Sequence, residues 1–215
     1  MDFIHPDYAH SALVIVDYQN DCILPTSPYA MPGAYEVLPA LTALTTAIRN
    51  ARRPIVHIVR GYLADGSNVD ACRRQSVIDG NPFLRVPGAG ADFPDCLKPM
   101  NAPPLDWSAL LAGEVQALGP YDHVIYKPRW GAFYQTPLEE FLHAHAINTL
   151  IVAGCNFPNC PRATIYEASE RDFRLVVASD ALSGLYDRGC KELTRIGVQL
   201  SDHTTLGKIF TLFSL

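Results

Sequence analysis

The sequence contains no long hydrophobic run, which argues against a membrane-spanning helix. Its uninterrupted apolar runs, such as Ala12–Val16 and Thr149–Ala153, are strand-sized and far shorter than the roughly 20 residues that a helix needs to cross a bilayer. The first residues of the chain also lack the basic and apolar segments of a secretory signal. We therefore expect a cytoplasmic protein that does not bind membranes.

Charge is scarce as well: charged residues make up 18% of the 215 residues, and the net charge is -5. A polycationic nucleic-acid binder would carry far more basic residues, and a disordered chain would have fewer than the 48% hydrophobic residues found here. We predict one compact domain over residues 1–215, with a small-molecule substrate and no nucleic-acid partner.

The six cysteines are too few for a disulfide scaffold of this size, and none of them form a CxxC pair suited to zinc. Most are expected to be small buried side chains, so a chemical role for any of them must rest on its local sequence. The histidines show no ligand spacing, and Gly88–Gly90 lacks the context of a dinucleotide site. No metal and no cofactor are therefore predicted.

Alternating apolar runs and helical patterns indicate an α/β fold. Five apolar runs bounded by turn residues predict strands buried on both faces, at Leu13–Val16, Ile55–Val59, Val124–Tyr126, Leu150–Ala153 and Leu175–Ala178. A last run, Ile209–Leu212, fits a sixth strand or a short terminal helix.

Helical spacing lies between these runs. It predicts helices over Val37–Ile48, over Leu138–His145, from about Pro161 to Arg171 and from about Arg188 to Leu200. Strands that alternate with helices of this length pair in parallel, which gives a three-layer α/β/α fold with function at the carboxyl ends of the strands. The segment Gly61–Gly119 is richer in Gly and Pro and is expected to form long loops with short helical pieces.

Three polar residues follow apolar runs where packing does not require them. Asp17 and Lys127 each come directly after a strand, and Cys160 ends a turn that follows another strand. If the three strands are parallel neighbours, an acid, a cation and a thiol meet at one edge of the sheet.

This trio suits attack by a thiolate on a carbonyl group. An ammonium such as that of Lys127 lowers the pKa of a nearby thiol, and a carboxylate such as that of Asp17 takes the proton and later returns it to a leaving amine. Cys160 also lies at the expected start of a helix, where the helix dipole favours the thiolate. The turn before it is suited to aim backbone N–H groups at an oxyanion.

The letters around the three residues are similar to those of a known enzyme family. They read Val-Asp-Tyr-Gln-Asn-Asp around Asp17, Lys-Pro-Arg-Trp-Gly-Ala-Phe from Lys127, and Ala-Gly-Cys-Asn-Phe-Pro-Asn-Cys up to Cys160. In this order, and over about Ala12 to Ser183, they resemble the isochorismatase-like cysteine hydrolases.

The resemblance implies a mostly parallel six-stranded sheet flanked by helices and an Asp-Lys-Cys triad formed by Asp17, Lys127 and Cys160. It implies an oxyanion hole at the backbone N–H groups of Asn156 and Cys160, and a cis peptide between Cys155 and Asn156. Relatives of this kind hydrolyse amides, lactams or carbamoyl groups, a few cleave a vinyl ether, and they usually form a homo-oligomer, here expected to be a dimer or tetramer.

The sequence departs from the family pattern in two places. Nicotinamidase-like members carry an Asp-x-His metal motif after the second strand, where this chain reads Arg-Gly-Tyr-Leu-Ala-Asp-Gly from Arg60, so no catalytic metal is expected. Cys22 replaces a common aromatic residue five positions past the aspartate. The wall of the pocket, and with it the substrate, therefore differs from that of the typical member.

Candidate substrate contacts lie near the three motifs. A flat aromatic ring and a guanidinium just past Lys127 are suited to recognise a planar polar group or a carboxylate, although surface packing explains the same residues nearly as well. The candidates are Cys22, Arg129, Trp130, Tyr134 and Phe157.

The sequence thus predicts a metal-free cysteine hydrolase that cleaves a carbon–nitrogen bond in a small amide, lactam or ureido compound through a thioester. Two alternatives stay open. One is vinyl-ether hydrolysis of an isochorismate-like substrate, and the other is a non-catalytic, partner-binding protein with the same fold.

Overall fold

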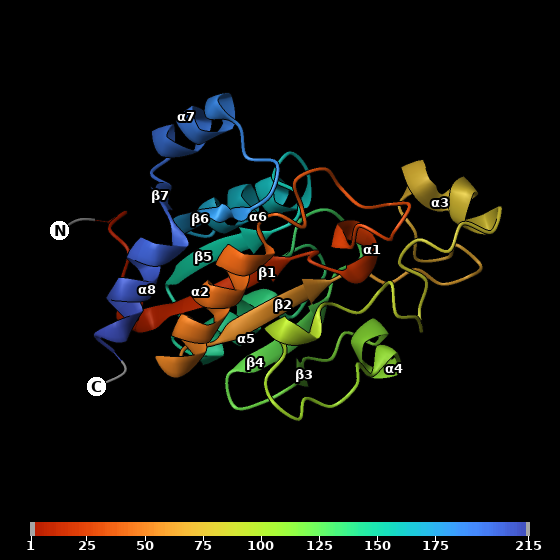
Figure 1. Cartoon of the computed structure of the whole chain (residues 1–215), viewed down its shortest axis with the longest axis horizontal. Helices are drawn as coiled ribbons and strands as arrows, with labels where there is room; N and C mark the ends of the chain where they lie inside the picture. Colours follow the sequence, from red (N-terminus) through yellow and green to blue (C-terminus); the bar gives the residue numbers. More distant parts are fainter. Residues whose placement is uncertain (1–2, 214–215) are drawn as a thin grey trace.

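The computed structural model describes residues 3–213 and is built around one twisted sheet (Figure 1). Residues 1, 2, 214 and 215, at the two ends of the predicted domain, lie outside the described part. Within residues 3–213 the strands are β1 (Ser11–Val16), β2 (Ile55–Val59), β3 (Gln116–Ala117), β4 (Asp122–Tyr126), β5 (Thr149–Gly154), β6 (Arg174–Leu182) and β7 (Gln199–Ser201). They are ordered β3-β4-β2-β1-β5-β6-β7, and all neighbours pair in parallel except β3 with β4.

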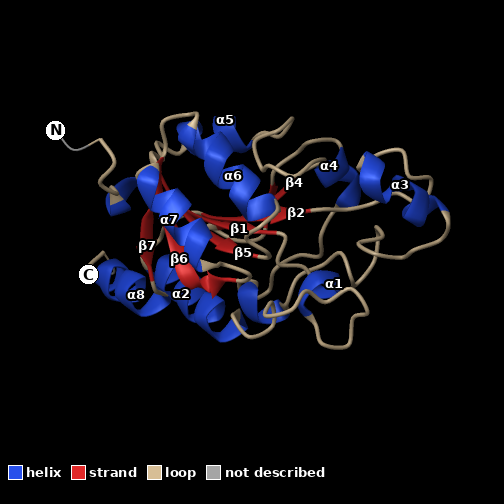
Figure 2. Cartoon of the chain, turned by 90° about the horizontal axis from the view of Figure 1, so that it is seen from above, coloured by secondary structure: helices blue, strands red, loops and turns tan. Residues whose placement is uncertain are grey.

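Helices cover both faces of the sheet (Figure 2). Strand residues alternate between two cores: Leu13 and Ile15 of β1 pack with α2 (Leu38–Asn50) and α8 (His203–Thr211), whereas Val14 and Val16 pack on the opposite face. The opposite layer consists of α5 (Leu138–Ala144), α6 (Cys160–Ser169) and α7 (Asp187–Arg195). Burial on both faces explains why the strands read as continuous apolar runs, and the predicted three-layer α/β/α class is confirmed.

The sheet has seven strands in the described residues, and the prediction of six is corrected. The last apolar run, which fits either a strand or a helix, belongs to α8. The sixth parallel strand is instead β7. It begins at Gln199, within the last residues of the helix predicted over 188–200. That helix ends at Arg195, and Gly197 then adopts a left-handed φ of 84°, which turns the chain toward the sheet. The seventh strand is the two-residue antiparallel edge strand β3.

The segment 61–119 forms long loops with short helices, as predicted. Its pieces are α3 (Ala71–Ile78), η2 (Asp95–Leu97) and α4 (Trp107–Leu111), together with β3. The two remaining short elements are η1 (Tyr8–His10) and α1 (Asn20–Ile23). In Figure 1, α3 and the separate helix α1 both lie beyond the arrowheads of the central strands. Through α3, the segment 61–119 contributes to the carboxyl edge of the sheet. Within residues 3–213, none of the helices combines the length and the apolar character needed to cross a membrane.

Candidate active site

The carboxyl ends of β1, β4 and β5 bring the three predicted residues to one edge of the sheet. Asp17 follows β1 with a left-handed φ of 49°, and its backbone N–H donates to Ile58 at 2.9 Å. Lys127 follows β4, and Cys160 is the first residue of α6. A left-handed φ is uncommon outside glycine, and here it turns the Asp17 side chain away from the strand into the space above the sheet edge.

Gly154 allows the close approach of β5 to β1 beside this site. It has a φ of 120°, and a Cβ atom at this position would lie 2.3 Å from the carbonyl oxygen of Val16. Only glycine fits such a contact. The nucleophile turn that begins here is therefore fixed directly against the strand that carries Asp17.

Asp17 and Lys127 form a buried ion pair. Nζ of Lys127 donates to Oδ2 of Asp17 at 2.8 Å and to the carbonyl oxygen of Arg129 at 3.1 Å, and the lysine side chain is fully buried. The other carboxylate oxygen, Oδ1 of Asp17, has no hydrogen-bond partner among the described residues. The lysine thus fixes one oxygen of the acid and leaves the other available for proton transfer.

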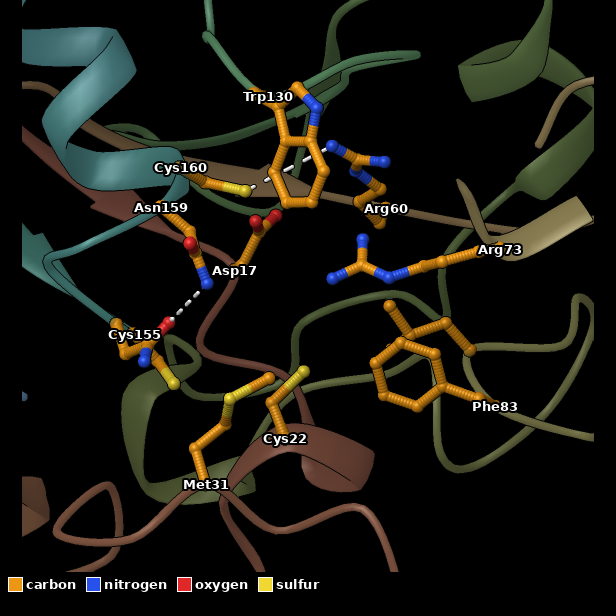
Figure 3. Close-up of a pocket in the computed structure, with 12 residues that line it drawn as sticks. Asp17, Cys22, Met31, Arg60, Arg73, Phe83, Trp130, Cys155, Asn159 and Cys160 are labelled. Atoms are coloured by element: carbon orange, nitrogen blue, oxygen red, sulfur yellow. Dashed lines mark hydrogen bonds between the residues drawn. The ribbon is translucent and has the colours of Figure 1, made fainter. Parts of the chain in front are cut away.

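The thiol of Cys160 faces Asp17 across a small cavity (Figure 3). Burial raises the pKa of Cys160 to about 11, and the negative charge of Asp17 adds to this shift, while Lys127 and Arg60 only partly oppose it. Sequence reasoning expected the nearby cation and the helix start to favour the thiolate. The resting side chain is instead a neutral thiol, so its proton has to leave during the attack on a substrate.

Arg60 directly follows β2 and lines the cavity, and it was not predicted as a site residue. Its buried guanidinium places Nη2 3.9 Å from Sγ of Cys160, and Nη1 donates to Asp70 and to Oη of Tyr62. The side-chain amide of Gln19 holds the backbone of Arg60: Nε2 donates to the Arg60 carbonyl oxygen, and Oε1 accepts from the Arg60 N–H. The available signal was its position directly after an apolar strand, the same signal that identified Asp17 and Lys127.

The cavity contains some of the predicted substrate contacts. These are Cys22 and Trp130, and Asn156, predicted for the oxyanion hole, lines the cavity with them, as do Asp17 and Cys160. The other lining residues are Met31, Arg60, Arg73, Phe83, Leu84, Cys155 and Asn159. Of these, Arg73, Phe83 and Leu84 come from the segment 61–119, whose loops gave no sequence signal for a site.

Three predicted contacts lie outside the cavity. Arg129 is turned away, with Nη1 donating to the backbone oxygens of Asn68 and Pro128. Tyr134 is 47% exposed on the surface. Phe157 is 1% exposed and packs its ring against Tyr186 at a centroid distance of 5.4 Å. The structure therefore does not bring these side chains to the thiol.

The turn that leads to Cys160 differs from the expected backbone in one respect. Among the described residues the cis peptide bond is Val86–Pro87, and the Cys155–Asn156 bond is trans, so the predicted cis peptide is corrected. The backbone N–H groups of Asn156 and Cys160 donate to no protein group within residues 3–213. For Cys160 this follows from its position in the first turn of α6, where N–H groups have no partner within the helix.

The two other cavity cysteines differ from Cys160 in their surroundings. Burial raises the pKa of Cys155 to about 12 and that of Cys22 well above its ordinary value. No cation contributes to the pKa shift of either thiol, whereas Lys127 and Arg60 both lower the pKa of Cys160. Of the three thiols, Cys160 is the one with cations beside it.

The described residues contain no group of three or more His, Cys, Asp or Glu side chains arranged to hold a metal ion. The position after β2, where nicotinamidase-like proteins are expected to carry metal ligands, holds the guanidinium of Arg60 instead. A guanidinium is a permanent cation with no lone pair to donate. The residues at this position do not fit a metal.

Comparison with known protein families identifies the fold. A family model described as the isochorismatase domain matches residues 11–203. The chain belongs to the isochorismatase family. This assignment confirms the resemblance seen in the three motifs, and the matched residues include Asp17, Lys127 and Cys160.

Individual isochorismatase-family proteins resemble the chain over most of its length. A probable inactive nicotinamidase from Arabidopsis thaliana is 24% identical over 198 residues, which cover 89% of this chain and 92% of the relative. Maleamate amidohydrolase from Pseudomonas putida is 26% identical over 177 residues, which cover 80% and 71% of the two chains.

A solved structure supports the same assignment. The crystal structure of an isochorismatase family protein from Desulfovibrio vulgaris matches with a TM-score of 0.79 and 27% identity, covering 94% of this chain and 98% of that chain. The relatives thus include an amidohydrolase as well as a protein described as probably inactive.

Proposed function

We propose that this isochorismatase-family protein is a cysteine-dependent hydrolase of a carbon–nitrogen bond in a small amide, lactam or ureido compound. The observation that carries the proposal is the buried Lys127–Asp17 pair beside the thiol of Cys160 in a partly enclosed cavity. Burial of these side chains shields them from bulk water and strengthens the electrostatic interactions between them, which favours acyl transfer.

The first half of the reaction forms a thioester. The Cys160 thiol gives its proton to Oδ1 of Asp17 while Sγ bonds to the substrate carbonyl carbon, and Lys127 holds the acid in position throughout. The resulting oxyanion accepts hydrogen bonds from the backbone N–H groups of Asn156 and Cys160. The carbon–nitrogen bond then breaks as Asp17 returns the proton to the leaving nitrogen.

The second half regenerates the enzyme. Asp17 accepts a proton from a water molecule whose oxygen attacks the thioester carbonyl. The carbon–sulfur bond breaks, the acid product leaves, and the proton returns to the sulfur of Cys160. Because the thiol is neutral at rest, each attack is coupled to proton transfer, which general acid–base groups accelerate by about two to four orders of magnitude.

A panel of small amides, lactams and ureido acids tests the proposal. Release of ammonia or amine is expected with the wild-type protein and is expected to fall by at least about three orders of magnitude in Cys160→Ala. Cys155→Ala is the matched control, because it removes a neighbouring cavity thiol that the mechanism does not use. Unchanged turnover in Cys160→Ala would falsify the proposal.

A non-catalytic role is the second candidate. The relative described as a probable inactive nicotinamidase and the missing metal motif favour it. In that case no compound of the panel is hydrolysed and Cys160 is not alkylated in preference to the other cysteines. Vinyl-ether hydrolysis is distinguished by the same variant, because Cys160→Ala then keeps its activity. A homo-oligomer remains a prediction from the family resemblance, and a cytoplasmic location remains a prediction from the sequence.

A further inference from the structure

The cavity contains more positive than negative charge. Its charged lining residues are Asp17, Arg60 and Arg73, and the side chains bonded directly behind them are Lys127 and Asp70. Lys127 compensates Asp17, and Asp70 compensates Arg60. Arg73 approaches Asp70 only at 3.5 Å. The three cations and two carboxylates of the cavity therefore leave one positive charge in excess, and it lies at Arg73.

Arg60 is held rigidly before any substrate binds. Nη1 is fixed by Asp70 and Tyr62, and the guanidinium lies 5.3 Å from the ring centroid of Trp130. These contacts orient Nη2 of Arg60 toward Sγ of Cys160, and the two atoms are 3.9 Å apart. A guanidinium whose orientation is already fixed loses little conformational freedom when it binds a planar anion.

Arg73 extends from α3 toward the centre of the cavity (Figure 3). Its guanidinium lies 4.6 Å from the ring centroid of Trp130 and 5.9 Å from that of Phe83, and Nη1 donates to Oη of Tyr62 at 3.2 Å. Stacking on aromatic rings uses the flat faces of the group, so N–H donors on its edge remain for a ligand.

We infer that Arg60 and Arg73 form a carboxylate subsite, and that the substrate is a small acid whose scissile amide or ureido group lies a few bonds from its carboxylate. Two guanidinium groups on one aromatic ring match the flat, two-oxygen shape of a carboxylate. This inference rests on the proposed function, and it narrows the substrate from any small amide to an anionic one.

The separation of the groups limits the length of that acid. An attacked carbonyl carbon lies about 3–3.5 Å from the sulfur before reaction, and Arg60 is itself 3.9 Å from the sulfur. A carboxylate on the two arginines is therefore close to the reacting carbonyl. The remaining wall, formed by Cys22, Met31, Phe83 and Leu84, suits a short apolar segment between the two groups.

Paired alkylating reagents test the subsite without a known substrate. Iodoacetate and iodoacetamide differ in whether a carboxylate or a neutral amide is attached to the reactive carbon. We expect the iodoacetate-to-iodoacetamide rate ratio at Cys160 to exceed that at exposed Cys96 by roughly 10- to 100-fold, as for a charge-assisted contact. Mass spectrometry of the separate peptides measures both rates in one sample.

Variants of α3 assign the effect to the cavity. Arg73→Gln is expected to lower the ratio at Cys160 toward that at Cys96. Arg74→Gln makes the same change in net charge one residue further along α3, where the side chain bonds to the backbone of Val69, and it should leave the ratio unchanged. Circular dichroism checks that both variants are folded.

The outcomes separate this inference from the proposed function. A ratio at Cys160 equal to that at Cys96, or an equal loss in both α3 variants, overturns the carboxylate subsite even where amides are hydrolysed. If instead no amide is hydrolysed but the ratio is high and falls in Arg73→Gln, the subsite stands and the proposed hydrolysis fails. Among substrates, monoamides of short dicarboxylic acids should be preferred to the neutral diamides of equal length, and Arg73→Gln should remove that preference.

Discussion

The cavity has two walls that are built differently. One, here called the sheet wall, consists of residues at or just after the carboxyl ends of strands: Asp17, Arg60 and Lys127, with Cys160 at the start of α6. Each is buried; Asp17, Arg60 and Lys127 are fixed by backbone or side-chain hydrogen bonds, and Sγ of Cys160 lies 3.9 Å from Nη2 of Arg60. A wall of this kind holds reacting groups in fixed positions.

The other, here called the loop wall, consists of Met31, Arg73, Phe83 and Leu84. Only Arg73 lies in a helix, and the others lie in irregular segments, where Leu84 has a left-handed φ of 50°. One of its contacts joins two side chains: the rings of Phe83 and Tyr29 lie 5.1 Å apart between centroids. The comparison indicates that the sheet wall carries the chemistry and that the loop wall selects the substrate.

The strongest test of the sheet wall is to break its buried ion pair. Lys127→Met leaves Asp17 as a buried charge without compensation, and the free energy of unfolding is expected to fall by about 3–5 kcal/mol. Urea denaturation measures the change. Lys98→Met is the matched control, because the two aspartates that pair with this lysine, Asp92 and Asp95, are both solvent-accessible, and the change should cost about 1 kcal/mol or less.

The double variant Asp17→Asn, Lys127→Met should recover much of that loss, since neither buried charge remains. If Lys127→Met unfolds at the same urea concentration as the wild type, the pair is not the rigid support that the comparison assumes. Both variants are expected to lose amide hydrolysis, so stability and activity are separated only in the double variant.

A smaller effect is expected in the pH dependence of Cys160. Because its pKa is raised to about 11, the thiolate fraction and hence the alkylation rate by iodoacetamide should keep rising from pH 7 to pH 10. An ordinary thiol levels off above about pH 9. Asp17→Asn removes a negative charge that raises this pKa, so the variant should react faster at neutral pH and level off earlier.

Peptide-resolved mass spectrometry measures this rate separately from that of exposed Cys96. A wild-type rate that levels off below pH 9, or slower alkylation in Asp17→Asn at neutral pH, contradicts the assigned surroundings of the thiol. The same variant is expected to lose hydrolysis while its thiol gains reactivity, a combination that simple misfolding does not produce.

The two walls also differ in how far they could be predicted from sequence. Buried strands and the polar residues that follow them have a local pattern, and this pattern predicts Asp17 and Lys127 from the sequence alone. Arg60 has the same pattern but was considered only as a missing metal ligand. The neutral state of Cys160 was not predictable, because it depends on how deeply the completed fold buries the sulfur.

The loop wall had no such pattern. Arg73 and Phe83 reach the cavity because long-range contacts fold the segment 61–119 over the sheet edge, and those contacts leave no periodic signal in the sequence. Tyr134 shows the converse. It was predicted as a substrate contact because it is close to Lys127 along the chain, but its ring lies outside the cavity. The edge strand β3, with two residues, is too short to give an alternation.

The smallest expected effect concerns the loop wall itself. Phe83→Leu removes an aromatic ring that lies 5.9 Å from the guanidinium of Arg73 while keeping an apolar side chain. Since a partly exposed cation–π contact is modest, KM for an anionic substrate should rise by roughly 2- to 5-fold with kcat nearly constant. Tyr29→Leu, which alters a ring that contacts Phe83 from outside the cavity, should change KM less. A fall in kcat without a change in KM would place Phe83 in the chemistry and remove the distinction between the two walls.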